Sequence, residues 1–256
     1  MQLKIQQLLV SVLILSGLML GGCSSGQSAL LSSSGSSATQ TTSIPATQAN
    51  NSPQMKNLPV LEGKATVVMT VKGAPITIEV DGTNARITAG NFVDLVQRGV
   101  YDGLMFHRVV RQPQPFVVQG GDPQSKDPKF PQPSLGTGGF TDPKTGAPRY
   151  IPLEIKPSGA NAPIYGRTLE SDNISAPPEL QHTRGAVAMA RSQQPDSASS
   201  QFYFALADLP FLDGSYAVFG RVTSGMDVVD KIQQGDRIES AKVTQGSENL
   251  KNVDNS

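Results

Sequence analysis

The chain has 256 residues, with 21 Lys and Arg against 21 Asp and Glu, so its formal net charge is zero. This balance argues against a nucleic-acid-binding protein, which needs a basic face to neutralise phosphates. One Cys and two His are too few to build a four-ligand zinc site from those residue types, and a single Cys cannot close an intrachain disulfide.

The first segment is almost uncharged, because Lys4 is the only charged residue before Lys56. Residues 8–20 form an apolar run of about 13 residues, which is too short to span a bilayer and is typical of the central part of a signal peptide. We therefore expect residues 1–22 to be a signal peptide.

The apolar run ends in Leu20-Gly21-Gly22-Cys23, which resembles a bacterial lipoprotein signal, where the Cys is lipidated and becomes the new N-terminus. We expect Cys23 to carry this lipid. The alternative is an ordinary secretory signal whose cleavage site lies near a Cys. Residues 23–58 then form a disordered tether, since a segment dominated by Ser, Thr, Gln and Asn buries too little surface to offset the entropy of ordering it.

The body of the chain opens with a hairpin pattern. Residues 66–72 are followed by 76–80, where apolar and polar side chains alternate as in a half-buried strand, and Gly73 lies at the turn. A helix comes next, in which Thr88 is expected to cap the N-terminus and Gly99 to end the last turn. The apolar face of this helix carries Phe92, Leu95 and Val96.

Short apolar runs bounded by Gly and Pro recur along the rest of the body. Many short strands with few helices favour a barrel or a sandwich. We expect one domain at 59–248 and a tail at 249–256. The runs predict strands at 104–110, 116–119, 186–190, 202–206, 217–222 and 238–243, with a second short helix at 226–232.

Residues 123–184 interrupt this pattern. These 62 residues hold 11 of the 19 prolines. Because proline removes a hydrogen-bond donor from a sheet, the stretch is predicted to run mostly as surface loop. Long ordered loops usually carry function.

Five sequence blocks follow one another over most of the body: Phe106–Val110, Phe116–Asp122, Gly185–Ala190, Ser199–Tyr203 and Leu212–Gly220. In this order they resemble the cyclophilin family of peptidyl-prolyl isomerases. The resemblance implies a mainly β fold, a closed antiparallel eight-stranded barrel capped by two helices, here with a long proline-rich loop insertion. Segments 140–143, 151–155, 164–170 and 235–240 are similar more narrowly to cyclophilins of the thylakoid lumen and their cyanobacterial relatives.

The resemblance implies catalysis of rotation about X–Pro peptide bonds. The barrier is about 18–20 kcal/mol, because rotation breaks amide resonance. No nucleophile is required, and we expect neither a metal nor a cofactor. A catalyst holds the proline ring and donates a hydrogen bond where the prolyl nitrogen becomes pyramidal. The resemblance assigns this donor to Arg108, whose guanidinium is always charged, and a supporting role to Gln119.

The resemblance also places substrate-binding residues. Phe106 and Phe202 are expected in the core, since neighbouring residues of a strand face opposite sides and Phe202 precedes Tyr203. His107 is interpreted as a structural or subsite residue, and His182 receives no role. The expected substrate-binding residues are Phe116, Val117, Tyr203, Leu212 and Tyr216 in the pocket, Phe211 at its rim, and the backbone of Ala190 and Arg191.

Several positions depart from the better-known eukaryotic pattern of the family. The connection 111–115 is a few residues longer than usual, which bears on the placement of Phe116 relative to Arg108. The substitutions are Tyr203 for a Phe, which adds a hydroxyl at the pocket floor, Tyr216 where a His is common, Phe211 where a Trp is common, and Arg191 for an Asn.

Two functional hypotheses follow. The first is a monomeric prolyl isomerase that acts on proline-containing client proteins and is held by its N-terminal lipid on a membrane, in a periplasm or a thylakoid lumen. The alternative is a protein-binding or assembly factor that uses the same scaffold with weak or no isomerase activity. A hydrolase has little support, since neither His is tied by sequence to a plausible nucleophilic Ser.

Overall fold

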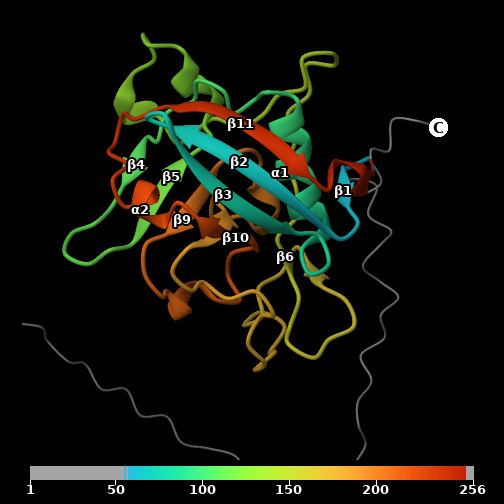
Figure 1. Cartoon of the computed structure of the whole chain (residues 1–256). Coiled ribbons are helices and arrows are strands. Elements are labelled where there is room, and N and C mark those ends of the chain that lie inside the picture. The colour runs from blue at the N-terminus through green and yellow to red at the C-terminus, as the bar shows by residue number, and fades with distance from the viewer. Residues whose placement is uncertain (1–54, 56, 252–256) are drawn as a thin grey trace, which may run out of the picture. The chain divides into compact units, whose positions relative to one another are not determined.

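The structure, a computed structural model, describes residue 55 and residues 57–251. These belong to the second of two compact units, Ile44–Ser256. The expected signal peptide, Cys23 and most of the expected tether lie outside the described residues. The described unit is built on an antiparallel eight-stranded sheet that curls around an apolar core (Figure 1).

The predicted hairpin is confirmed as β2 (Lys64–Val71) and β3 (Ala74–Asp81), which pair along their whole length. Buried and partly exposed residues alternate along both strands, so one face points to the core. Lys72 and Gly73 both have positive φ, 51° and 73°, as a two-residue turn matched to the twist of the strands requires.

The other strands complete the sheet in the order β11-β2-β3-β10-β8-β9-β5-β4. Met105 and Arg237 form an isolated bridge that brings the segments leading into β4 and β11 together. The sheet begins at β11 and ends at β4, so the expected barrel is observed as a curled sheet. The bounds are β4 Arg108–Val109, β5 Val117–Gly120, β8 Ala186–Met189, β9 Phe202–Ala205, β10 Val218–Ser224 and β11 Ile238–Gln245.

Two α-helices accompany the sheet. Helix α1 (Arg86–Gln97) packs on β1 (Val60–Leu61) and β11, and its Phe92 meets Phe202 edge-to-face with ring centroids 5.5 Å apart. Helix α2 is only Met226–Val229, three residues shorter than expected. Phe106 and Phe202 are fully buried in the main core, as predicted.

The end of α1 is as expected, but its beginning is not. Gly99 has φ 66° and donates to the Val96 carbonyl, while the Val100 N–H donates to Leu95; this pattern satisfies the last carbonyls of a helix. The prediction that Thr88 is the N-cap is wrong, because the capping position is Ala85. The Ala85 side chain accepts no hydrogen bond from the first N–H groups of the helix.

Glu154 supplies the missing acceptor from the proline-rich segment. Its buried carboxylate accepts from the N–H groups of Ile87 (3.2 Å) and Thr88 (2.8 Å), from the Thr88 hydroxyl (2.8 Å) and from the Tyr165 hydroxyl (3.1 Å). Burial raises the pKa of the Glu154 carboxyl, and these four donors act in the opposite direction. A negative charge here also complements the positive end of the helix dipole.

The proline-rich segment is tied to the domain at further points. The Asp122 carboxylate accepts from the N–H groups of Gly136 (2.6 Å) and Gly138 (3.2 Å). The Phe140 N–H donates to the Ser199 hydroxyl at 2.9 Å. The segment contains two short 3-10 turns, η1 Pro123–Lys126 and η2 Gln132–Ser134, and a small sheet of β6 (Glu154–Ile155) and β7 (Ile164–Tyr165).

The end of the described chain also belongs to the fold. After β11, the turn η5 (Ser247–Asn249) leads into β12 (Leu250–Lys251), which pairs with β1. The folded part therefore continues to Lys251, beyond the expected end at residue 248. Among the described residues, no helix is long and apolar enough to cross a membrane.

Glu154→Ala is expected to lower the free energy of unfolding by about 2–4 kcal/mol, because it leaves buried N–H groups of Ile87 and Thr88 without an acceptor. Glu154→Gln keeps an acceptor oxygen and should lose less. The measurement is urea unfolding followed by circular dichroism. Glu170→Ala, at an exposed position, is the control; equal midpoints for Glu154→Ala and this control would contradict the capping role.

Candidate functional site

Strand register aligns a row of residues across five strands. Arg108 of β4 lies opposite Gln119 of β5, and Gln119 lies opposite Tyr203 of β9. Tyr203 in turn lies opposite Ala188 of β8, which faces Val218 of β10. Residues directly opposite in an antiparallel sheet share one face, so this row marks the face turned away from the main core.

This outer face carries a second apolar cluster, separate from the main core. Alternation along β9 explains the division, since Phe202 and Phe204 are in the main core while Tyr203 and Ala205 belong to the outer cluster. We call the outer cluster the apolar patch. It consists of buried Val117, Ala186, Ala188, Tyr203, Ala205, Leu209 and Val218, with partly buried Phe116, Leu180, Ala190, Ala207 and Leu212 packed against it.

Arg108 lies at the edge of the apolar patch and is exposed. One of its terminal nitrogens donates to the Gln119 side-chain oxygen at 3.3 Å, and its guanidinium carbon lies 5.4 Å from the centre of the Phe116 ring. The guanidinium is thus held over an aromatic face, and its other N–H groups have no hydrogen-bond partner in the part of the chain that the structure describes. The longer connection before Phe116 does not separate it from Arg108.

The hydrogen-bond chain that holds Arg108 continues through a residue that sequence reasoning missed. The Gln119 side-chain nitrogen donates to the Gln201 oxygen at 3.1 Å, and the Gln201 nitrogen donates to the Gly138 carbonyl at 2.7 Å. Gln201 is two residues before Tyr203 and just ahead of β9, so the period-2 pattern of a strand would have placed both on one face. The proline-rich segment thereby supports the orientation of Arg108.

Aromatic rings border the patch. Phe116 stacks on Phe211 with centroids 6.0 Å apart and an interplanar angle of 19°, and Phe211 is 69% exposed. Tyr203 and Tyr216 meet edge-to-face at 6.3 Å. Leu212 packs against the buried part of the patch. The ten residues expected to form the site, other than Cys23, therefore gather on or around this one face.

The guanidinium of Arg191 is hydrogen-bonded within the protein. Its guanidinium donates to the carbonyls of Ser215 (2.7 and 3.0 Å), Ser192 (2.8 Å) and Gln193 (3.1 Å), and lies 4.7 Å from the Tyr216 ring centre. It therefore fixes the loop that carries Tyr216. The neighbouring Ala190 N–H donates to the Gln201 carbonyl at 2.9 Å, so that N–H is engaged within the sheet.

The two histidines differ. Within the described part of the chain, neither ring nitrogen of His107 has a hydrogen-bond partner, and burial lowers the pKa of His107. His182, which received no role, is buried beneath the patch and contacts Tyr203 and Asp213. The extra hydroxyl of Tyr203 was the one sequence signal for such a partner, because a buried hydroxyl needs one.

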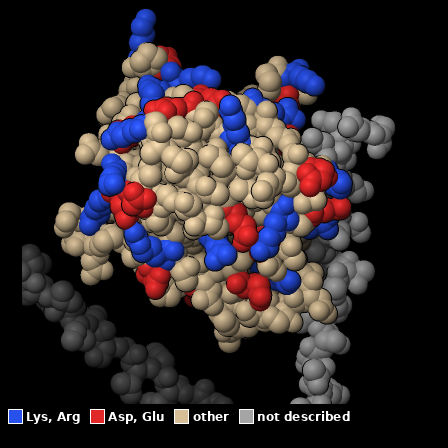
Figure 2. All heavy atoms as spheres, viewed as in Figure 1, with Lys and Arg blue, Asp and Glu red and all other residues tan. Residues whose placement is uncertain are grey.

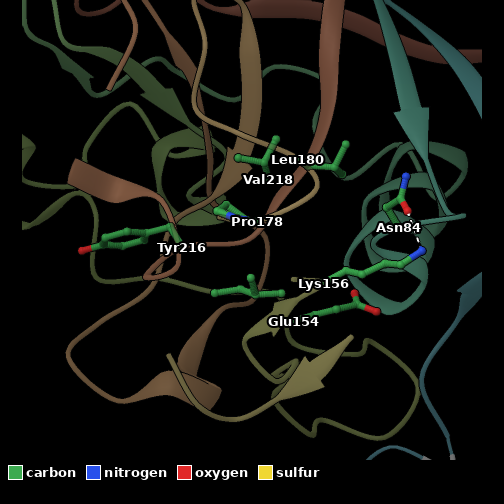
Figure 3. Close-up of a pocket in the computed structure, with 8 residues that line it drawn as sticks. Asn84, Glu154, Lys156, Pro178, Leu180, Tyr216 and Val218 are labelled. Carbon is green, nitrogen blue, oxygen red and sulfur yellow. Dashed lines mark hydrogen bonds between the residues drawn. The ribbon is translucent and has the colours of Figure 1, made fainter. Parts of the chain in front are cut away.

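A small hollow lies beside the patch (Figure 3). Its volume of about 10 Å³ admits no more than one water and excludes a proline ring. In Figure 3 the Tyr216 ring extends away from Asn84 and Lys156, whose side chains are joined by a 3.0 Å hydrogen bond. This hollow is therefore not the pocket expected for a proline ring.

Charge elsewhere on the surface is mixed. On the face shown in Figure 2, residues of both signs surround a broad uncharged area over β2 and β3. No group of three or more His, Cys, Asp or Glu among the described residues could hold a metal ion. The chemistry available at the patch is apolar binding beside a hydrogen-bond-donating cation.

Solved structures share the fold. A cyclophilin-type peptidyl-prolyl cis-trans isomerase from Cryptosporidium parvum superposes with a TM-score of 0.53 at 21% identity, covering 71% of this chain and 98% of that one. At this level of identity the similarity concerns the fold alone. It agrees with the curled eight-stranded sheet and the two helices.

Curated proteins with similar sequences share more identical residues with this chain than that solved structure does. A putative thylakoid lumen peptidyl-prolyl cis-trans isomerase of Synechocystis is 45% identical over 78% of this chain and 52% of its own length. CYP38, a chloroplastic isomerase of Arabidopsis thaliana, is 39% identical over 78% of this chain and 46% of its own. The chain thus spans about half the length of these two relatives. A probable isomerase of Brucella abortus is 34% identical over 70% of this chain and 76% of its own length.

The family model described as cyclophilin type peptidyl-prolyl cis-trans isomerase matches residues 66–253. This range contains the whole eight-stranded sheet from Thr66 of β2 onward and every described residue of the candidate site. The chain belongs to the cyclophilin-type peptidyl-prolyl cis-trans isomerase family.

Proposed function

We propose that the chain accelerates cis–trans isomerisation of X–Pro bonds in proline-containing client proteins, acting as a monomer. The observation that carries this function is the placement of Arg108, held by Gln119 and by the Phe116 ring at the edge of the apolar patch. Family membership supports the same reaction.

The mechanism is non-covalent. The patch around Phe116, Leu212 and Tyr203 holds the proline ring, and the free N–H groups of Arg108 donate to the prolyl nitrogen as it becomes pyramidal and loses amide resonance. That hydrogen bond forms only in the twisted amide, so it lowers the barrier without tightening the ground state. Each 1.36 kcal/mol of such preference raises the rate tenfold.

The location of the protein is part of the proposal. The lipoprotein-like sequence at Cys23 and the name of the Synechocystis relative, which places that protein in the thylakoid lumen, support an extracytoplasmic domain anchored by an N-terminal lipid. The expected tether, residues 23–58, would end one residue earlier, because Leu58 is buried in the main core; as a flexible coil it would have an r.m.s. span of roughly 30–35 Å.

A second candidate function is protein binding in a groove that adjoins the patch. An open groove of about 530 Å³ shares Leu180, Ala186 and Val218 with the patch and continues along β3 and β10 past charged Glu79 and Arg221. It supports contact with a client segment beyond the proline. A broad deletion in the proline-rich segment cannot separate binding from catalysis, since Gly138 supports Gln201.

Arg108→Ala is expected to lower kcat for an X–Pro tetrapeptide about 100-fold, as for loss of one transition-state hydrogen-bond donor. Arg108→Lys keeps the charge but loses the planar fork, and should recover only part of the rate. The assay is protease-free NMR exchange. Arg167 is another exposed Arg, and Arg167→Ala should isomerise the tetrapeptide as fast as the unaltered chain. If Arg108→Ala were equally fast, Arg108 would be ruled out as the hydrogen-bond donor.

Cys23→Ala is expected to abolish a lipid-sized increase in the mass of the mature chain and to release the protein from the membrane fraction. Intact-mass spectrometry and fractionation of the expressing cells measure both. Cys23→Ser, which keeps the size of the residue but also lacks the thiol, should show the same loss. Retention of the mass increase in either variant would contradict lipidation at this residue.

Lys64→Glu combined with Arg221→Glu replaces the two cations of the groove, both paired with Glu79, and leaves only acidic charges along it, together with Glu79, Asp81 and Glu179. Binding of a carboxymethylated, permanently unfolded protein should weaken severalfold, because the acidic groove then repels the negative charge of that probe, while tetrapeptide isomerisation stays unchanged. Biolayer interferometry and NMR exchange provide the two readouts. Unchanged binding would exclude the groove, and a parallel loss of isomerisation would show that groove and patch are one site.

A further inference from the structure

The segment before β8 places a buried imidazole directly behind the apolar patch. The side chain of His182 is fully buried. Its Nδ1 lies 2.8 Å from Asp213 Oδ1, and its Nε2 lies 3.0 Å from the Tyr203 hydroxyl. His182 thus joins the loop that follows Leu212 to the strand that carries Tyr203, two parts of the site that are separate in sequence.

The chemistry of the partners fixes the direction of both hydrogen bonds. The Asp213 carboxylate only accepts, so His182 Nδ1 carries the proton. In a neutral imidazole the other nitrogen is then an acceptor, and the Tyr203 hydroxyl donates to Nε2. Burial lowers the pKa of His182, against an opposing effect of Asp213, which keeps the ring neutral near pH 7.

Main-chain bonds make this link rigid. The same Asp213 oxygen also accepts from the His182 backbone N–H at 2.8 Å, and the His182 carbonyl accepts from the Leu209 N–H at 2.7 Å. The turn η4 (Pro210–Leu212), which carries Phe211 and Leu212, lies between these two attachment points. Its position on the patch is therefore fixed by His182 at both ends.

Tyr203 is held from the other side. Its ring is nearly parallel to the imidazole, with an interplanar angle of 15° and centroids 6.1 Å apart, and meets Tyr216 edge-to-face. A Phe at this position would keep the ring but leave His182 Nε2 buried without a donor. The hydroxyl that distinguishes Tyr203 is thus used inside the protein, to fix the ring.

We propose that His182 is a positioning residue for isomerisation: by bonding Asp213 and Tyr203 at once, it sets the spacing between the Tyr203 ring and the η4 turn that bears Leu212. This proposal rests on the proposed function, because the patch is taken as the proline-binding surface. His182 itself does not touch the substrate. It acts through the Tyr203 ring and through Leu212, which do.

The test compares variants that break the link at different points in the full chain. Tyr203→Phe removes the hydroxyl alone, and His182→Asn keeps a donor toward Asp213 but is too short to reach Tyr203. Each is expected to lower kcat/KM for an X–Pro tetrapeptide about tenfold, and the double variant no further, because both substitutions break the same bond. His182→Gln, whose amide oxygen reaches toward Tyr203, should restore the rate to within about threefold.

Tyr165→Phe is the matched control, since it removes a Tyr hydroxyl bonded to Glu154 away from the patch; it should keep kcat/KM while urea midpoints report any loss of stability. If the losses of kcat/KM in the two single variants added in the double variant, or if each single variant stayed within twofold of the unaltered chain, the positioning role of His182 would be overturned. The proposed function would not be affected by either result. If the unaltered chain gave no acceleration, the proposed function would fall with it.

Discussion

A one-residue slip of β5 against its neighbours would turn Gln119 and Val117 toward the core and bring Val118 to the outer face. What prevents it is the apolar inner face, where Val118, Phe202 and Phe204 are fully buried and Phe202 packs edge-to-face on Phe92 and Phe204. In the slipped register Phe204 would lose Val118 as its neighbour across the strands, and the polar Gln119 side chain would face the core instead. The core thus determines which side chains form the candidate site, although it touches no substrate. The alignment of Arg108, Gln119 and Tyr203 is a consequence of packing behind them.

The proline-rich segment is an integral part of this arrangement. Glu154 binds the first turn of α1, and Gly138 receives the bond from Gln201 that continues to Gln119. One end of the segment therefore stabilises the fold while another supports the orientation of Arg108. Arg149 adds a further tie between the segment and α1, since it pairs with Asp94 while its guanidinium carbon lies 4.8 Å from the centre of the Phe140 ring. A surface loop with so many buried polar attachments behaves as a structural element of the domain.

Local patterns in the sequence predicted local structure well. Alternation at 76–80, the turn at Gly73 and the helix end at Gly99 depend on neighbouring residues and are confirmed. The resemblance to a known family predicted a mainly β fold with eight strands and two helices, and the residues that it assigned to a site lie on or around one face of the sheet. The failures involve contacts between distant residues. Thr88 has good capping chemistry, but a carboxylate 66 residues further along the chain binds the helix end. The partnership of His182 with Tyr203 and Asp213 could not be predicted either, because no spacing rule connects three residues from different loops and strands.

The pairing of the first strands of the described domain with its last strands has a consequence for the order of synthesis and folding. β1 pairs with β12, and β2 pairs with β11, so strands from the first part of the domain find partners only in its last part. Pairings of such long sequence separation form slowly and only after the intervening chain is present. A ribosome-bound chain that ends before residue 238 has no partner for the outer edge of β2. The domain therefore stays incompletely folded until translation has passed its last strands.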